Sequence, residues 1–183
     1  PRAHGINVAL PGYTLAPEAR LTEIVAEIRQ ALGYLAGSSA ELGFDRTRII
    51  IGGWSAGGHL TAAVADHPAV RGGIPISGIF DLEPIALGVL NDKLQLSADE
   101  IETLSPLRTL GAGLPPLRMF VGGSELPELK RQSEEYARVA QARGLPVSLT
   151  TLPGHHHFSI LGELARPDGA ISLALCDLIA KLG

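Results

Sequence analysis

The sequence has a single cysteine, Cys176, among its 183 residues. One thiol cannot form an internal disulfide, so a disulfide-stapled secreted fold is excluded and a cytoplasmic location is predicted. Cys176 lies within an apolar helical pattern, where a cysteine normally acts as a small buried hydrophobe. We therefore expect no cysteine chemistry.

An excess of basic residues is also missing, since 15 lysines and arginines stand against 19 acidic residues. This balance argues against a nucleic-acid partner. The apolar runs are short and interrupted by glycine or charge, so no membrane span is expected. Hydrophobic residues make up 45% of the chain and charged residues 19%, which suffices for one folded domain over residues 1–183. The predicted partner is a small molecule, and a homodimer is compatible with the sequence.

What the sequence does contain is an alternation of short apolar runs and longer helical patterns. Strands are expected at 6–10, 48–53, 72–77, 116–123 and 146–152, and helices at 17–36, 56–65, 126–143 and 169–182. The alternation predicts an α/β fold with a mostly parallel sheet and helices on both faces. The run at 48–53 is apolar at its centre, as is typical of a strand covered on both faces. Chemistry in such folds lies beyond the carboxyl ends of the strands.

Residues 80–115 interrupt the alternation with a segment rich in leucine, proline and acidic residues, in which a short helix is expected at 98–104. An insertion of this length between two strands is more often a functional cover than an idle loop. We therefore predict a cap-like insertion, with Phe80, Leu82 and Leu90 lining the substrate pocket.

The stretch Gly53-Trp54-Ser55-Ala56-Gly57 fits the pattern G-x-S-x-G, between a predicted strand and a predicted helix. In that context the pattern is typical of a nucleophile elbow, a strained turn whose glycines admit close neighbours. The alternative is a structural turn. Ser55 is the predicted nucleophile, and the N–H of Ala56 at the helix start is the predicted oxyanion donor. Trp54, beside the serine, is expected to contact the substrate.

A serine hydroxyl needs a base, and in this fold the order along the chain is serine, acid, histidine. Three of the six histidines follow the last predicted strand, in "PGHHHFS" (153–159). We predict His157 as the base, with His156 as the alternative. His59 lies one helical turn beyond Ser55, where packing or capping is the expected role. Three consecutive histidines rarely converge on one ion, so no metal is expected.

The predicted acid is Glu125, which follows the strand at 116–123 and lies next to the histidine loop. A carboxylate there would accept the imidazole N–H and fix its tautomer. Asp81, directly after the strand at 72–77, is the competing candidate. Capping of a helix is the structural alternative for either residue.

Six motifs, in order, resemble one branch of a known family: "PGYTLAPE" (11–18), "GWSAGGHL" (53–60), "SGIFDL" (77–82), "LSPLR" (104–108), "VGGSELPELKRQS" (121–133) and "HHFSIL" (156–161). Together they are similar to the arylformamidase branch of the α/β-hydrolases, a neighbour of the hormone-sensitive-lipase-like esterases. The resemblance implies hydrolysis of N-formylkynurenine or of simple activated esters without a cofactor. It assigns Ser55, Glu125 and His157 the roles of nucleophile, acid and base, with glutamate where relatives often carry aspartate.

The sequence departs from that family at its start. Relatives carry a His-Gly-Gly stretch, which supplies half of the oxyanion hole, well before the "PGYTLAPE" motif, and this sequence has none. Three strands of the family fold also have no counterpart, which predicts an N-terminally truncated α/β-hydrolase. The strands at 6–10 and 48–53 would then pair directly or leave apolar edges exposed. The competing hypothesis is a non-catalytic homologue or fragment that serves as a binding domain.

Overall fold

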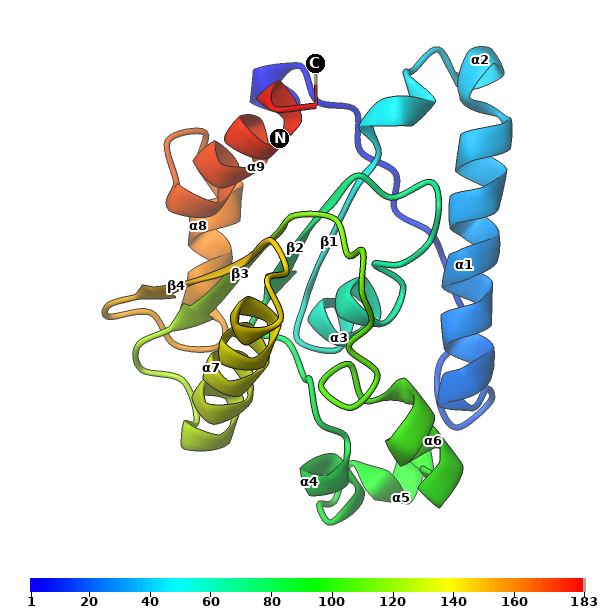
Figure 1. Ribbon diagram of the computed structural model, residues 1–183, viewed down its shortest axis with the longest axis vertical. Coiled ribbons are helices and arrows are strands. Elements are labelled where there is room, and N and C mark those ends of the chain that lie inside the picture. Colours follow the sequence, from blue (N-terminus) through cyan, green and yellow to red (C-terminus); the bar gives the residue numbers. More distant parts are fainter. Residues whose placement is uncertain (183) are drawn as a thin grey trace.

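A parallel sheet lies at the centre of the computed structural model, which describes residues 1–182 (Figure 1). Its four strands lie side by side in chain order: β1 (Ile50–Trp54), β2 (Gly72–Ile76), β3 (Leu117–Gly122) and β4 (Val147–Leu152). One row across the sheet runs through Trp54, Ile76, Phe120 and Thr150. The four strands therefore end at the same edge of the sheet, and the loops that follow them are neighbours.

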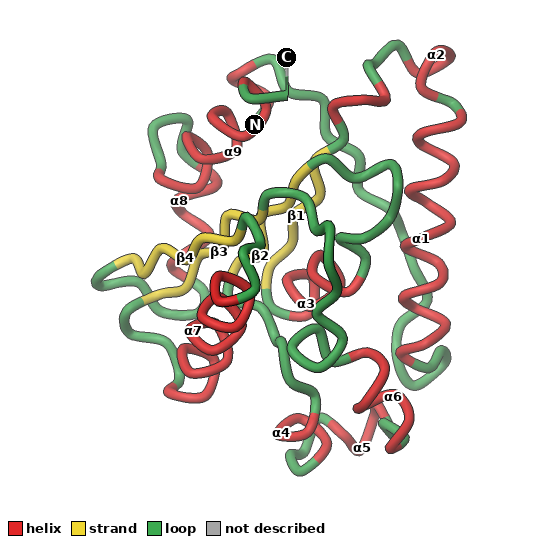
Figure 2. The backbone as a smooth tube through the Cα atoms, in the orientation of Figure 1, coloured by secondary structure: helices red, strands yellow, loops and turns green. Residues whose placement is uncertain are grey.

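Helices cover both faces of this sheet (Figure 2). α3 (Ala56–Ala63) and α7 (Pro127–Ala142) pack on one face, and α9 (Ala170–Ala180), which contacts α8 (Gly162–Ala165), packs on the other. α1 (Leu21–Gly37) lies outside α3 and contacts it. The described residues also contain short helices and 3₁₀ turns: α2 (Ser39–Leu42), α4 (Glu83–Ala86), α5 (Asn91–Leu94), α6 (Ala98–Leu104), and turns at Arg2–His4, Arg46–Arg48 and Ser159–Leu161.

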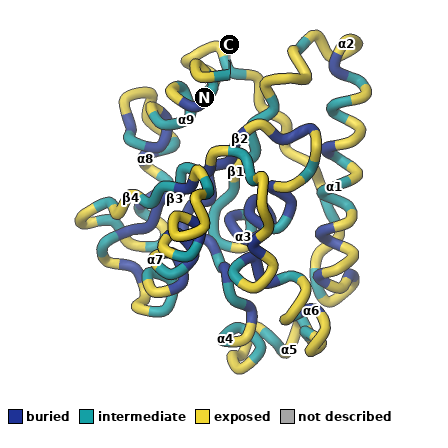
Figure 3. Tube along the Cα trace, viewed as in Figure 1, coloured by how far each residue is buried: buried dark blue, intermediate teal, exposed yellow. Residues whose placement is uncertain are grey.

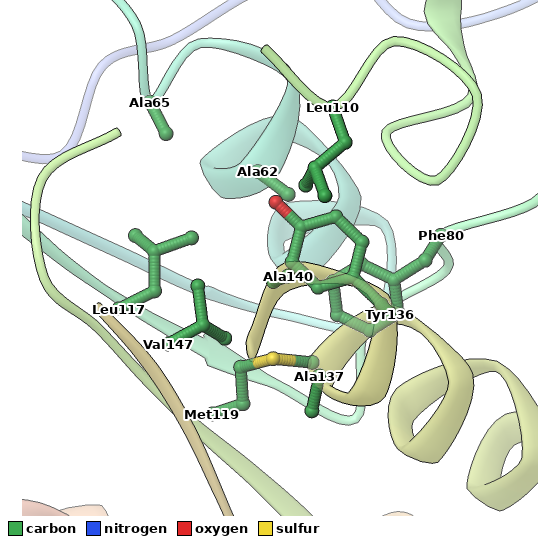
Figure 4. Close-up of a cluster of buried hydrophobic side chains, with 10 residues drawn as sticks. All are labelled: Ala62, Ala65, Phe80, Leu110, Leu117, Met119, Tyr136, Ala137, Ala140 and Val147. Carbon is green, nitrogen blue, oxygen red and sulfur yellow. The ribbon is translucent and has the colours of Figure 1, made fainter. Parts of the chain in front are cut away.

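The period-two pattern of the strands explains this layering. In β3, Leu117 and Met119 pack against α3 and α7, whereas Phe120 points to the opposite face and packs in the cluster that includes Leu178 of α9. Figure 4 shows the first of these clusters, in which the Phe80 ring lies against the Tyr136 ring with centroids 4.7 Å apart. β2 and β3 are the most buried strands, as Figure 3 shows.

The predicted α/β fold with a parallel sheet is therefore confirmed, together with its helices on both faces. The predicted helix at 98–104 coincides with α6, and the strand ends at 72–77, 116–123 and 146–152 differ from the structure by at most one residue. The long helix expected at 17–36 begins later, at Leu21. Its buried residues Leu21, Ile24, Val25 and Leu32 keep the predicted helical spacing.

The predicted strand at 6–10 is wrong. These residues form a loop, with Val8 53% and Leu10 89% exposed. An apolar run becomes a strand only when a neighbouring strand satisfies its backbone, and in residues 1–182 β1 pairs with β2 alone.

Both faces of β1 are packed, as expected for the run at 48–53: Ile51 lies against the clusters on the α3 side, and Ile50 and Trp54 lie against the cluster that includes Leu178 of α9. β1 is nevertheless an edge strand of the described sheet, and none of its five residues is fully buried. Of the two outcomes expected for this part of the fold, direct pairing or exposed apolar edges, the second is therefore observed.

The insertion at 80–115 contains α4, α5 and α6, which lie at the lower end of the molecule in Figure 1. Its base is held to the rest of the fold by buried groups. The Gln132 side chain of α7 accepts hydrogen bonds from the backbone N–H groups of Phe80 and Asp81 at 2.8 and 2.9 Å. Glu100 of α6 is buried and accepts from the backbone N–H and the hydroxyl of Thr22 in α1.

Candidate active site

Ser55 sits between β1 and α3 in a strained conformation, with φ 57° and ψ −116°. Its backbone N–H donates to the carbonyl of Ile76 at 2.9 Å, and its own carbonyl accepts from His59 in the first turn of α3. A serine is held at such dihedral angles only where its surroundings fix them, and strain of this kind concentrates at functional sites. The local geometry is that of the predicted elbow.

The two glycines of the motif differ in whether the structure leaves room for a side chain at their position. A Cβ on Gly53 would lie 2.3 Å from the carbonyl oxygen of Gly57, so no side chain fits there. A Cβ on Gly57 would meet nothing within 4 Å. The sharp turn therefore needs a glycine at position 53, while Gly57 contributes its backbone to the close approach.

His157 reaches Ser55 from the loop after β4, 102 residues further along the chain. Its Nε2 lies 3.1 Å from the Ser55 hydroxyl, and its Nδ1 lies 3.0 Å from Oε2 of Glu125. With Nδ1–H donating to the carboxylate, Nε2 is left as the acceptor for the serine proton. The imidazole is thus bonded on both sides, in the order that proton transfer from Ser55 requires.

Glu125 lies in the loop after β3, and its side chain is fully buried. This loop is fastened to the histidine loop, because the N–H of Ser124 donates to the carbonyl of His155 at 2.9 Å. The approach is so close that a Cβ on Gly122 would lie 2.2 Å from that same carbonyl oxygen. The glycine before the "GSE" turn therefore allows acid and base to share one edge of the sheet.

Trp54 contacts both the backbone and the ring of His157. Its indole N–H donates to the backbone carbonyl of His157 at 2.8 Å, and its ring lies 4.7 Å from the imidazole and 5.5 Å from the Phe158 ring. A half-buried aromatic with a satisfied N–H is well suited to hold a loop in place. This contact could not be predicted from the sequence, because the two residues are 103 positions apart.

Ala56 is the first residue of α3, so its N–H points out of the helix start without an acceptor inside the helix. That placement agrees with the predicted role as oxyanion donor, which stays a prediction. The second donor expected from a His-Gly-Gly stretch has no counterpart in this sequence.

The competing candidates lie elsewhere. Asp81 forms an ion pair with Arg108 at 3.1 Å. His156 accepts backbone hydrogen bonds within its own loop through Nδ1. His59 is 3% exposed and its Nε2–H donates to the carbonyl of Leu104 at 2.8 Å, so it packs α3 against the insertion. Burial lowers the pKa of His59 and keeps its ring neutral.

The residues expected to line the pocket are not placed together. Phe80 and Leu82 are 1% and 3% exposed and belong to two core clusters, so the expectation that they line a pocket is corrected for this structure. Gln132 of α7 holds the backbone at Phe80, and the Ser105 hydroxyl accepts from the N–H of Leu82, which keeps both side chains in the core. Leu90 lies at the tip of the insertion and is 58% exposed, so it stays a candidate.

Within residues 1–182, no cluster of histidine, cysteine and acidic side chains has an arrangement suited to a metal ion. The same residues contain no helix whose length and apolar character would let it cross a bilayer.

A family model described as "alpha/beta hydrolase fold" matches residues 2–103, which include the serine motif but not Glu125 or His157. Kynurenine formamidase from Danio rerio is 27% identical, over 97% of this chain and 64% of that protein. Carboxylesterase NlhH from Mycobacterium tuberculosis is 29% identical, over 92% of this chain and 62% of that protein.

Among solved structures, an esterase from Pyrobaculum calidifontis superposes with a TM-score of 0.79 and 20% identity, covering 92% of this chain and 64% of that one. At this identity the likeness shows the fold alone. The chain spans a little under two thirds of the length of the curated relatives it matches.

Proposed function

Since the chain belongs to the α/β-hydrolase fold family, we propose that it is a serine hydrolase that cleaves carboxyl esters or aryl formamides. One observation carries the proposal: the His157 imidazole is hydrogen-bonded to the Ser55 hydroxyl on one side and to the Glu125 carboxylate on the other. A chance meeting of these three groups would not also place the serine on a strained elbow.

In the proposed reaction, His157 Nε2 takes the proton of the Ser55 hydroxyl while the serine oxygen attacks the substrate carbonyl carbon. The buried Glu125 carboxylate stabilises the imidazolium that forms. His157 then gives the proton to the leaving alcohol or amine, and an acyl or formyl group stays on Ser55. A water molecule, deprotonated by His157, releases the acid and restores the serine.

The oxyanion of each tetrahedral intermediate would be held by the N–H of Ala56 at the start of α3. Loss of one donor of such a pair typically lowers turnover by about 10²–10³-fold. The motifs named above supply one oxyanion donor, so the activity is proposed for the full-length protein, which is called the full chain in the experiments below.

The substrate class follows from the chemistry of the site and from the relatives. Two of the relatives are a kynurenine formamidase and a carboxylesterase, and we infer from them the two carbonyl types that Ser55 would attack. A formyl carbon carries only hydrogen, so a narrow acyl pocket favours formamides and a wider one favours esters. The proposal also includes a small-molecule substrate, a cytoplasmic location and a reaction that needs no cofactor.

The test compares hydrolysis of N-formylkynurenine and of a short-chain nitrophenyl ester by the full chain and by its Ser55→Ala variant. We expect hydrolysis of at least one substrate and a loss of about 10⁴–10⁶-fold in kcat in the variant. The matched control is Ser38→Ala, a serine without a side-chain cap bond at the end of α1. Turnover unaffected by Ser55→Ala, or no turnover of either substrate by the folded full chain, would contradict the proposal.

A further inference from the structure

We propose that Ser77 is a positioning residue for Glu125, fixing the carboxylate in the orientation from which it reaches His157. The inference rests on the proposed function and adds one residue to the same site. Ser77 directly follows β2, between the strand that ends at the nucleophile and the strand that precedes the acid. The loops after the four strands thus present Ser55, Ser77, Glu125 and His157 in the order of the sheet.

The contact involves both oxygens of the carboxylate. The Ser77 hydroxyl donates to Oε1 of Glu125, while Oε2 accepts from Nδ1 of His157 at 3.0 Å. The Glu125 side chain and Ser77 have no exposed surface, so water cannot take the place of either partner. A buried carboxylate needs a donor on each oxygen, and Ser77 supplies the second one.

A glutamate also has a conformational reason to need this donor. Its side chain has three rotatable bonds, and a single hydrogen bond to His157 would leave the carboxylate free to rotate about the last of them. With Oε1 fixed by Ser77, the remaining oxygen is aimed at the imidazole. The hydroxyl therefore acts on the reaction through Glu125 and does not itself touch the substrate.

The backbone of Ser77 is an independent observation that points to the same role. Its φ is +47°, a backbone conformation that residues other than glycine, asparagine and aspartate rarely adopt. The conformation is held by the Ser77 N–H, which donates to the carbonyl of Phe120 at 2.8 Å. Glycine would fit this backbone without strain, so the presence of a serine calls for a reason, and its hydroxyl provides one.

The test uses Ser77→Gly in the full chain, because glycine relieves the backbone and removes only the hydroxymethyl group. We expect thermal stability within a few degrees of the parent, kcat for a nitrophenyl ester lower by about 10- to 100-fold, and KM within twofold. Ser77→Ala, which keeps the Cβ, should show the same fall in kcat. The matched control is Gln95→Gly, which relieves an equal φ of +47° at an exposed residue of the insertion and should leave kcat unchanged.

A coupling measurement separates positioning from general support of the fold. In a Glu125→Ala background, Ser77→Gly should lower kcat no further, since the hydroxyl acts only through the carboxylate. Unchanged kcat in both Ser77 variants, or an equal loss with and without Glu125, would overturn the inference. A parent chain that neither hydrolyses the ester nor reacts with a fluorophosphonate would overturn the proposed function. This result is obtained on the parent alone, so it is distinguished from a failure of the inference about Ser77.

Discussion

Replacement of Trp54 tests how tightly the base is held in place. Trp54→Phe keeps an aromatic face beside His157 but removes the N–H that donates to the His157 carbonyl at 2.8 Å. A half-buried neutral hydrogen bond contributes about 1 kcal/mol, which corresponds to about a fivefold loss in kcat if the loop is released. Trp54→Leu also removes the ring that faces the imidazolium, worth about 0.5–2 kcal/mol more, so the expected loss is about 10- to 100-fold.

The assay is steady-state hydrolysis of two esters with different acyl groups, together with the rate of fluorophosphonate labelling. If Trp54 positions His157, both esters lose the same factor in kcat and labelling slows in parallel. If Trp54 instead contacts the substrate, as its place beside Ser55 in the sequence suggested, KM changes by an amount that depends on the acyl group. Variants that change only KM would refute the positioning role.

Three further outcomes are expected. Gly53→Ala should lower the free energy of unfolding by at least about 3 kcal/mol, because its Cβ would lie 2.3 Å from a backbone oxygen. Gly57→Ala is the control, because its Cβ meets nothing within 4 Å, and urea unfolding of the two variants checks the difference. Since burial lowers the pKa of His59, the unfolded chain binds a proton more readily. Stability should therefore be full above about pH 6.5 and fall below it by up to about 1.4 kcal/mol per pH unit, a slope that His59→Gln should reduce in urea titrations between pH 5 and 7. Glu125→Gln, which keeps the shape and removes the charge, should lower kcat by about 10²–10⁴-fold with little change in KM; an unchanged kcat would show that the carboxylate is not needed.

The sequence predicted the elements whose signals are local. α6 has a serine cap followed by Glu100 three residues later, and the structure contains that capping box with the predicted bounds. Three of the four observed strands are apolar runs bounded by turn residues, and their alternation with helices predicted that they are parallel. The prediction that Ser55, Glu125 and His157 lie together agrees with the observed hydrogen bonds, because each residue follows a strand and a parallel sheet brings such positions to one edge.

What the sequence did not predict depends on contacts between distant residues. The run at 6–10 has the composition of a strand, but strand formation needs a partner, and the described residues provide none there. Phe80 and Leu82 are as apolar as pocket residues, and their burial depends on hydrogen bonds to distant residues. The N–H of Phe80 donates to Gln132, and the N–H of Leu82 donates to Ser105. The serine of "SGIFDL" carried no local sign that its backbone has a positive φ or that its hydroxyl meets Glu125.

The most direct test of the central claim is to map the adduct of a fluorophosphonate on the full chain by mass spectrometry. The account predicts one adduct, on the peptide that contains Ser55, formed far more slowly when His157 is replaced by glutamine and absent in Ser55→Ala. A folded chain that forms no adduct, or forms it on a different residue, would contradict the account.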